Sequence, residues 1–122
     1  MFVAKILLIC AAVALVSGNP QTLGAPRQLS GADLEQSKRT LQESLTKLAA
    51  GEGPNYRISK ILSASHQVVA GSLDRYTVEL IDSNGQTKVC DVKIWSRTWL
   101  PNGIEVTFEC PNEEPLVRKH NP

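Results

Sequence analysis

Residues 34–48 read LEQSKRTLQESLTKL, and the apolar pattern of this stretch decides the fold. Leu34, Leu41, Leu45 and Leu48 recur at spacings of seven, four and three residues, with polar or charged side chains between them. This period predicts one apolar stripe on an amphipathic helix. Such a stripe is stable only when a second layer of secondary structure covers it.

The residues on either side mark the ends of this helix. Ser30 is a favourable N-cap residue, and Asp33 makes an acidic variant of the capping box with it. Gly51 and the pair Gly53-Pro54 follow the stripe, and such residues end helices. We therefore expect the helix to lie between Ser30 and Gly51.

Beyond the helix, β-branched and aromatic residues become frequent, and the apolar pattern takes the period of strands. The Asp-Ser-Asn-Gly sequence at residues 82–85 predicts a tight hairpin, because Asn and Gly accept positive φ at little cost. We predict four strands, at residues 56–68, 73–81, 87–95 and 104–110. The order of elements indicates an α+β fold, with one long helix packed on a four- to five-stranded antiparallel sheet.

The start of the chain has the layout of a secretory signal peptide. One basic residue, Lys5, precedes an apolar run over residues 6–16, and the small pair Ser17-Gly18 follows it. The run is shorter than the stretch of about 20 apolar residues that a membrane span needs. We expect residues 1–18 to be cleaved, and the protein to be secreted and to have no membrane partner.

Residues 19–29 are rich in Pro, Gly and Gln and lack apolar periodicity, so we expect a flexible N-terminal arm there. Residues 30–122 then make up a single domain. The whole chain carries 13 Lys plus Arg and 12 Asp plus Glu. This near-neutral balance argues against nucleic acid as a partner.

Cleavage of the signal peptide removes Cys10 and leaves Cys90 and Cys110 in the secreted chain. Two cysteines in an oxidising compartment pair, and a bridge that closes a loop of roughly 20 residues contributes about 3 kcal/mol in the chain-entropy model. A metal site is the alternative, but His66 and His120 stand at no ligand spacing from these cysteines. We expect a disulfide, no metal and no cofactor.

The connection between the first two predicted strands is unusual for a hairpin tip, because it reads Gln67-Val68-Val69-Ala70-Gly71. Ordinary tips use Gly, Asn, Asp and Pro, whereas the centre of this one is apolar and β-branched. If the tip is exposed, it presents apolar surface to water at one end of the sheet. Alternatively, Val68 and Val69 finish a strand and Gly71 alone makes the turn.

The loop between the third and fourth predicted strands, at residues 96–103, holds Trp99 and Leu100 beside turn-forming Pro and Asn-Gly. Trp is a preferred anchor residue at protein interfaces. The alternative is that Trp99 folds back onto the sheet as a core residue. Trp95, at a strand end, is assigned to packing. In an antiparallel meander this loop and the first tip lie at the same end, so together they form a candidate binding wedge.

These segments resemble the cystatin family. Gln67-Val68-Val69-Ala70-Gly71 matches the family's Gln-x-Val-x-Gly signature. Leu23-Gly24-Ala25-Pro26 is similar to the arm motif of secreted single-domain cystatins, and Trp99 is similar to the Trp of their second binding loop. Cys90 and Cys110 resemble their second disulfide. The overall pattern is similar to insect cystatins of the sarcocystatin type.

The resemblance implies a cystatin-like fold and a reversible, competitive inhibitor of papain-like cysteine proteases of the cathepsin L or B type. Arm and loops would enter the active-site cleft as a wedge, with the arm turning away at its Gly before the catalytic cysteine. Contact of this kind buries about 800 Å² per partner and needs no side-chain chemistry. The protease-binding residues would be Leu23, Gly24, Gln67, Val68, Val69, Ala70, Gly71, Thr98 and Trp99.

Three features depart from the family. Thr98 stands where the second loop usually has Pro, so the loop loses a fixed φ. The family's first disulfide is missing, and the compact turn at residues 82–85 stands in its place. Residues 51–55 read Gly-Glu-Gly-Pro-Asn where some secreted cystatins carry a Ser-Asn-Asp motif against asparaginyl endopeptidase, so we predict no such second activity.

Two other functions compete with inhibition. An enzyme needs a nucleophile with a base or a pair of positioned carboxylates, whereas the secreted chain offers two histidines, no free thiol and scattered acids. We therefore expect no catalytic residues. The stronger rival is a cystatin-fold binding or carrier protein that does not inhibit proteases, since one fold hosts several functions. We expect a monomer, although exchange of the first hairpin between copies would give a dimer.

Overall fold

The leucine stripe lies on a helix, as the sequence predicts. In the computed structural model, which describes residues 25–122, the helix α2 comprises Gly31–Ala50. Leu41 and Leu45 are 0% and 1% exposed, Leu48 is also buried, and Leu34 packs against the edge of the same cluster. The stripe is therefore covered along most of the helix.

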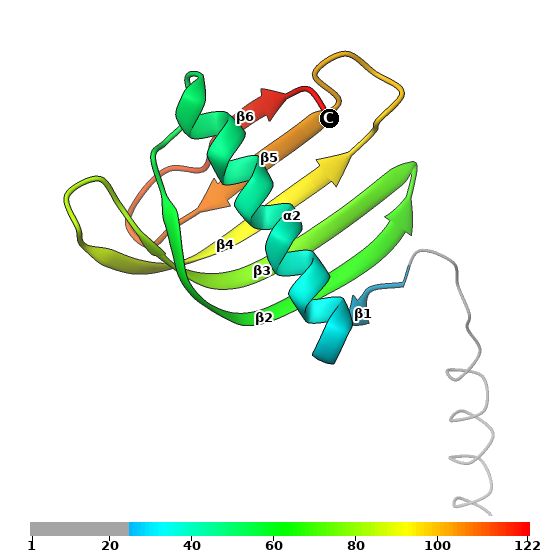
Figure 1. Cartoon of the computed structure of the whole chain (residues 1–122), viewed down its shortest axis with the longest axis horizontal. Helices are drawn as coiled ribbons and strands as arrows, with labels where there is room; N and C mark the ends of the chain where they lie inside the picture. The colour runs from blue at the N-terminus through cyan, green and yellow to red at the C-terminus, as the bar shows by residue number, and fades with distance from the viewer. Residues whose placement is uncertain (1–24) are drawn as a thin grey trace, which may run out of the picture.

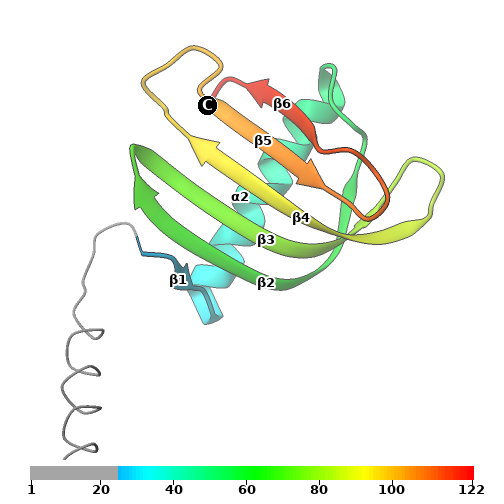
Figure 2. The same ribbon diagram turned by 180° about the vertical axis from the view of Figure 1, so that it is seen from behind.

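The layer that covers the stripe is one antiparallel sheet, and its strand order follows the chain (Figure 1). Figure 2 shows the sheet from behind, with α2 crossing only the far face. The strands are β1 Arg27–Gln28, β2 Arg57–Val69, β3 Gly71–Ile81, β4 Thr87–Ser96, β5 Ile104–Glu109 and β6 Leu116–His120. The predicted cystatin-like α+β architecture is confirmed, and the described chain contains six strands rather than four or five.

The two additional strands lie at opposite edges of the sheet. β1 falls within the predicted arm and pairs only through Arg27 with His66 and Gln28 with Ser65. β6 pairs with β5 over its whole length, from Leu116 opposite Phe108 to His120 opposite Ile104. Neither segment carries the apolar run of a central strand, because each has a neighbour on one side only.

Alternate residues of β3, β4 and β5 form the core with the helix. The apolar inward residues are buried, with Asp74 and Lys88 as charged residues on the same face, whereas the outward ones are mostly polar and at least partly exposed. The apolar inward set is Tyr76, Val78, Leu80, Cys90, Val92, Ile94, Ile104, Val106 and Phe108. This alternation is typical of an antiparallel sheet with one covered face.

Two bulges bend β2 around the helix (Figure 1). The register with β3 shifts between Ile58 and Lys60 and again between Ile61 and Ser63. An extra residue in one strand increases local twist and curvature. At the second shift the extra residue is Leu62, which is 50% exposed.

Polar contacts fix how the helix lies on the sheet. Tyr76 donates a hydrogen bond from its hydroxyl to the Ser37 carbonyl oxygen at 2.9 Å and accepts one from Ser37 Oγ at 3.1 Å. Burial raises the pKa of Tyr76, so the hydroxyl keeps its proton and its donor role. Nearer the other end of the helix, His120 Nε2 lies 2.9 Å from Ser44 Oγ.

The helix begins at the predicted residue but by different chemistry. Ser30 is the N-cap in extended conformation, yet its side chain makes no capping hydrogen bond, so the predicted capping box is wrong. Gly31 has φ +58° and turns the chain into the helix. The Asp33 carboxylate lies 3.4 Å from Arg27 Nη1, outside the helix. At the other end, Gly51 is the C-cap, as expected.

The predicted disulfide between Cys90 and Cys110 is present, and both cysteines are buried. It joins β4 to the residue that follows β5, one position beyond the pair Asp91 and Glu109. The bridge therefore staples the part of the sheet remote from the β2–β3 turn. No helix within residues 25–122 is both long and apolar enough to cross a membrane.

Replacing Leu41 tests the helix–sheet contact. Leu41→Ala should lower the free energy of unfolding by about 2–5 kcal/mol, because it leaves a cavity in a fully buried site. Gln42→Ala, on the exposed side of the same turn, should change it by less than about 0.5 kcal/mol. Chemical denaturation measures both, and equal stability of the two variants would contradict this packing.

Candidate functional site

The two apolar loops that the sequence singles out lie at the same end of the sheet (Figure 1). Ser72, near the start of β3, is paired with Ser96, at the end of β4. The turn between β2 and β3 and the loop between β4 and β5 leave the sheet beside this pair. We call these two segments, residues 68–71 and 97–103, the wedge.

The first segment is a very tight reversal. Val69 pairs with Gly71, so Ala70 stands alone at the apex. Val68 and Val69 belong to β2, as one of the two interpretations of the sequence had it, yet their side chains are 59% and 40% exposed. Gln67 is half-buried behind them. The strand therefore runs to the apex and presents apolar surface to water.

Gly71 is required by both backbone conformation and space. Its φ of +96° is one that residues with a side chain rarely adopt. A Cβ at this position would also overlap the carbonyl oxygen of Ser96. The β2–β3 turn therefore packs directly on the backbone that enters the second segment, so the two parts of the wedge are in contact.

The second segment is built from two consecutive turns. Leu100 N donates to the Arg97 carbonyl oxygen at 3.0 Å, and Gly103 N donates to the Leu100 carbonyl oxygen at 3.1 Å. Arg97 N closes the base by donating to the Gly103 carbonyl oxygen at 2.8 Å. Thr98 and Trp99 occupy the middle of the first turn, and both are exposed. Trp99 is 62% exposed, so it is not a core residue.

The C-terminal residues brace this loop, which the sequence did not predict. Asn102 has φ +52°, and its backbone N–H donates to Asn121 Oδ1 at 2.7 Å. The Asn121 carbonyl oxygen lies 3.4 Å from Lys47 Nζ on the helix. Asn121 thus links the backbone of Asn102 in the loop to Lys47 on the helix. Only the folded position of the chain end reveals such a contact.

Trp95, assigned to packing from the sequence, contacts both parts of the wedge. Its indole Nε1 donates to the Ala70 carbonyl oxygen at 3.0 Å. The Arg97 guanidinium carbon lies 3.7 Å from the centre of the ring, at cation–π distance. Trp95 faces the side of the sheet away from the helix, beside Val69 and Leu73. Strand register, not sequence spacing, brings these groups together.

The predicted arm is only partly within the described residues. Leu23 and Gly24 lie outside them, as does the predicted signal peptide. Ala25 and Pro26 are exposed and precede β1. Because β1 is antiparallel to β2 with Arg27 opposite His66, the chain before Arg27 approaches from the side of Gln67 and the β2–β3 turn.

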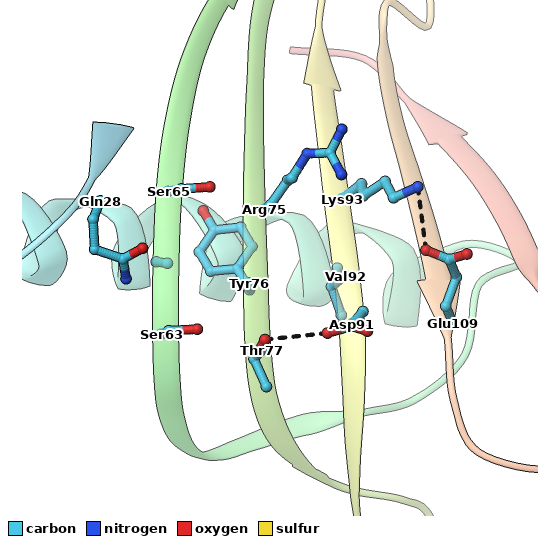
Figure 3. A pocket seen from close by; sticks show the side chains of 11 residues that line it. Gln28, Ser63, Ser65, Arg75, Tyr76, Thr77, Asp91, Val92, Lys93 and Glu109 are labelled. Atoms are coloured by element: carbon cyan, nitrogen blue, oxygen red, sulfur yellow. Dashed lines mark hydrogen bonds and ion pairs between the residues drawn. The ribbon is translucent and has the colours of Figure 1, made fainter. Parts of the chain in front are cut away.

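The open face of the sheet holds a shallow polar hollow of about 330 Å³ (Figure 3). Lys93 Nζ lies 3.2 Å from Glu109 Oε1, and Thr77 Oγ1 donates to Asp91 Oδ1 at 3.1 Å. Arg75 lies in the same hollow. The hollow thus contains charged groups of both signs, and the Lys93 ammonium is already paired. It therefore offers no field of a single sign to attract a charged substrate.

Nothing in the wedge provides acid–base or nucleophilic chemistry. His66 is a β2 residue whose Nδ1 lies 2.6 Å from Asp74 Oδ1 on the neighbouring strand, on the helix side of the sheet, and His120 contacts Ser44 of the helix. Within residues 25–122 no group of three or more His, Cys, Asp or Glu side chains is placed to hold a metal ion. The large exposed side chains of the wedge are apolar, and such a surface is suited to docking.

Comparison with known proteins gives several relatives. The chain is 49% identical over 120 residues to sarcocystatin-A of Sarcophaga peregrina, a match that covers 96% of this chain and 98% of that protein. It is 36% identical to a cystatin-like protein of Drosophila melanogaster, over 88% of this chain and 86% of that one. Cysteine proteinase inhibitor 6 of Arabidopsis thaliana is 33% identical, over 62% of this chain and 34% of its own. No family model matches the chain.

Two glycine substitutions separate backbone strain from contact between the wedge segments. Gly71→Ala should lower the free energy of unfolding by about 1–3 kcal/mol more than Gly85→Ala, because only the first creates an overlap. Both glycines have positive φ, but a Cβ at Gly85 meets nothing within 4 Å. Chemical denaturation provides the comparison, and equal losses would mean that the turn does not pack on Ser96.

Proposed function

Because this chain belongs to the cystatin family, we propose that it is a reversible, competitive inhibitor of papain-like cysteine proteases of the cathepsin L or B type. The family is non-enzymatic, and the proposed inhibition is steric. The inhibitor fills the active-site cleft and leaves the catalytic cysteine without access to substrate.

The exposed apolar end of the sheet carries this proposal. Val68, Val69, Trp99 and Leu100 are between 38% and 62% exposed, and they project from two segments that touch each other. A folded domain gains nothing from apolar side chains held in water, so such a cluster is typical of a protein-binding surface. Two adjacent apolar segments that project from one end of a sheet suit insertion into a cleft.

Each part of the wedge has a proposed role. The β2–β3 turn and Trp99 cover the primed side of the cleft, with Val68, Val69 and Ala70 against apolar walls and Trp99 as the aromatic anchor. Thr98 takes the position where Pro is usual in the family, at the second residue of the first turn. There it leaves φ free, which reduces preorganisation of this loop.

The arm is proposed to complete the site on the non-primed side. Leu23 would fill an apolar subsite, and Gly24 would let the chain turn away before the catalytic cysteine. The chain before Arg27 enters β1 from the side of the β2–β3 turn, which supports this role because the two loops lie at that end of the sheet.

We also propose that the protein is secreted as a monomer after removal of residues 1–18. The disulfide supports this, since such bonds persist in oxidising compartments. Secreted material should have an intact mass that begins near Asn19, and it should not react with an alkylating reagent. Retention of residues 1–18, or a reactive Cys90, would contradict this proposal.

The inhibition itself is tested with papain and a small fluorogenic substrate. The chain lacking residues 1–18 should raise the apparent KM without changing kcat, and it should be recovered uncleaved, because a wedge competes only for the free cleft. Trypsin should be unaffected. A folded, disulfide-bonded protein that does not inhibit papain or cathepsin L at micromolar concentration would disprove inhibition and favour the binding or carrier role.

The same assay locates the contact surface. Trp99→Ala should weaken inhibition by roughly 30-fold, equivalent to about 2 kcal/mol, while thermal unfolding stays unchanged because this side chain is exposed. The matched control is Val89→Ala, which removes another exposed apolar side chain from β4 near its opposite end. It should inhibit like the wild type.

A further inference from the structure

Trp95 occupies a position from which one side chain reaches both segments of the wedge. It stands near the end of β4, opposite Leu73 of β3 and Glu105 of β5, and it faces the open side of the sheet. The edge of its ring donates to the Ala70 carbonyl oxygen, and the face of its ring lies under the Arg97 guanidinium. The indole thus has a different contact on its edge and on its face.

The hydrogen bond from the indole edge reaches Ala70, the one residue of the β2–β3 turn that no strand pairing holds. Ala70 is the single residue between the paired Val69 and Gly71, so ladder hydrogen bonds end on either side of it. Its carbonyl oxygen receives the indole N–H at 3.0 Å. A donor from β4 therefore holds the apex from outside the hairpin to which the apex belongs.

The contact on the indole face is made by Arg97, which lies at the base of the second segment. Arg97 is the residue whose backbone N–H and carbonyl group close the loop, through Gly103 and Leu100. Its guanidinium stacks on the indole, and its Nη2 lies 3.8 Å from Glu105 Oε1. The residue whose backbone closes the loop base therefore rests its side chain on the same ring that holds the apex.

We infer that Trp95 is a positioning residue of the wedge, which sets the β2–β3 apex and the β4–β5 loop in one fixed arrangement before the protease arrives. This inference rests on the proposed inhibition, but it concerns a residue that need not touch the protease. Preorganisation raises affinity by reducing the ordering that binding must otherwise impose. Loss of the indole donor should reduce the fraction of molecules whose wedge is ready to bind.

Preorganisation and direct contact differ in kinetics. A smaller binding-competent fraction lowers the apparent association rate, whereas loss of a direct contact mainly raises the dissociation rate. Trp95→Phe keeps an aromatic face for Arg97 but removes the N–H donor, together with part of the ring area. It should weaken inhibition of papain by about 3- to 10-fold through slower association. Trp99→Ala should instead dissociate faster.

A matched control removes a hydrogen bond between strands at the opposite end of the same hairpin. Ser59 Oγ donates to Glu79 Oε1 at 2.8 Å, and both residues are remote from Ala70. Ser59→Ala should leave the association and dissociation rates unchanged. If it slowed association as much as Trp95→Phe does, the effect would come from general loosening of the hairpin and the inference would be wrong.

Hydrogen exchange on the free protein gives a readout that is independent of any protease. In the wild type, the indole N–H of Trp95 should exchange more slowly than that of the exposed Trp99. In Trp95→Phe, the amides of Ala70 and Gly71 should exchange faster. Equal exchange of the Trp95 and Trp99 indoles would overturn the inference. This comparison uses the wild type alone, so it holds even if Trp95→Phe fails to fold.

The two proposals fail in different ways. If the wild type does not inhibit papain, the proposed function is wrong, and the exchange experiment still decides whether Trp95 holds the apex. If the wild type inhibits but Trp95→Phe matches it in association rate and in exchange, Trp95 is not a positioning residue and inhibition stands.

Discussion

The burial of one leucine stripe under one face of the sheet is the interaction on which the rest of the structure depends. Leu41 and Leu45 lose essentially all contact with water only because β3, β4 and β5 turn alternate residues toward them. Two layers with one interface leave the opposite face of the sheet to solvent, and that face is accordingly mostly polar. The apolar residues of the β2–β3 turn and the β4–β5 loop lie beyond this interface, so folding does not use them.

Stability and recognition are consequently concentrated at different ends of the sheet. The end remote from the wedge carries the disulfide, the tight turn at residues 82–85 and the pair between Lys88 and Glu113, whose hydrogen bond raises the pKa of Lys88. At the wedge end close backbone contacts add to those of Trp95 and Asn121: a Cβ at Gly71 or Gly103 would meet the carbonyl oxygen of Ser96 or Arg97. Such contacts allow little change in main-chain position, while the exposed side chains above them remain free to meet a partner.

Much of this arrangement could be predicted from the sequence, because it depends on local periods and turn chemistry. The helix stripe, strands β2 to β5 and the hairpin at Asn84-Gly85 each have a signal within a few residues. The strands β1 and β6 have none, since the edge of an existing sheet creates them. The supporting roles of Trp95 and Asn121 were missed for a related reason: each depends on a partner that only strand register or the folded chain end brings near.

The chain-order arrangement of the sheet has a consequence for how the molecule assembles. Each pair from β2 to β6 joins consecutive strands, so each closes a short loop and costs little chain entropy. The pair of β1 with β2 is different, because Arg27 and His66 are separated by the whole helix. We expect a two-residue strand that closes so long a loop to pair late and to open early. We therefore expect the β1–β2 pairing to open independently of the rest of the sheet, while the two loops keep their mutual geometry.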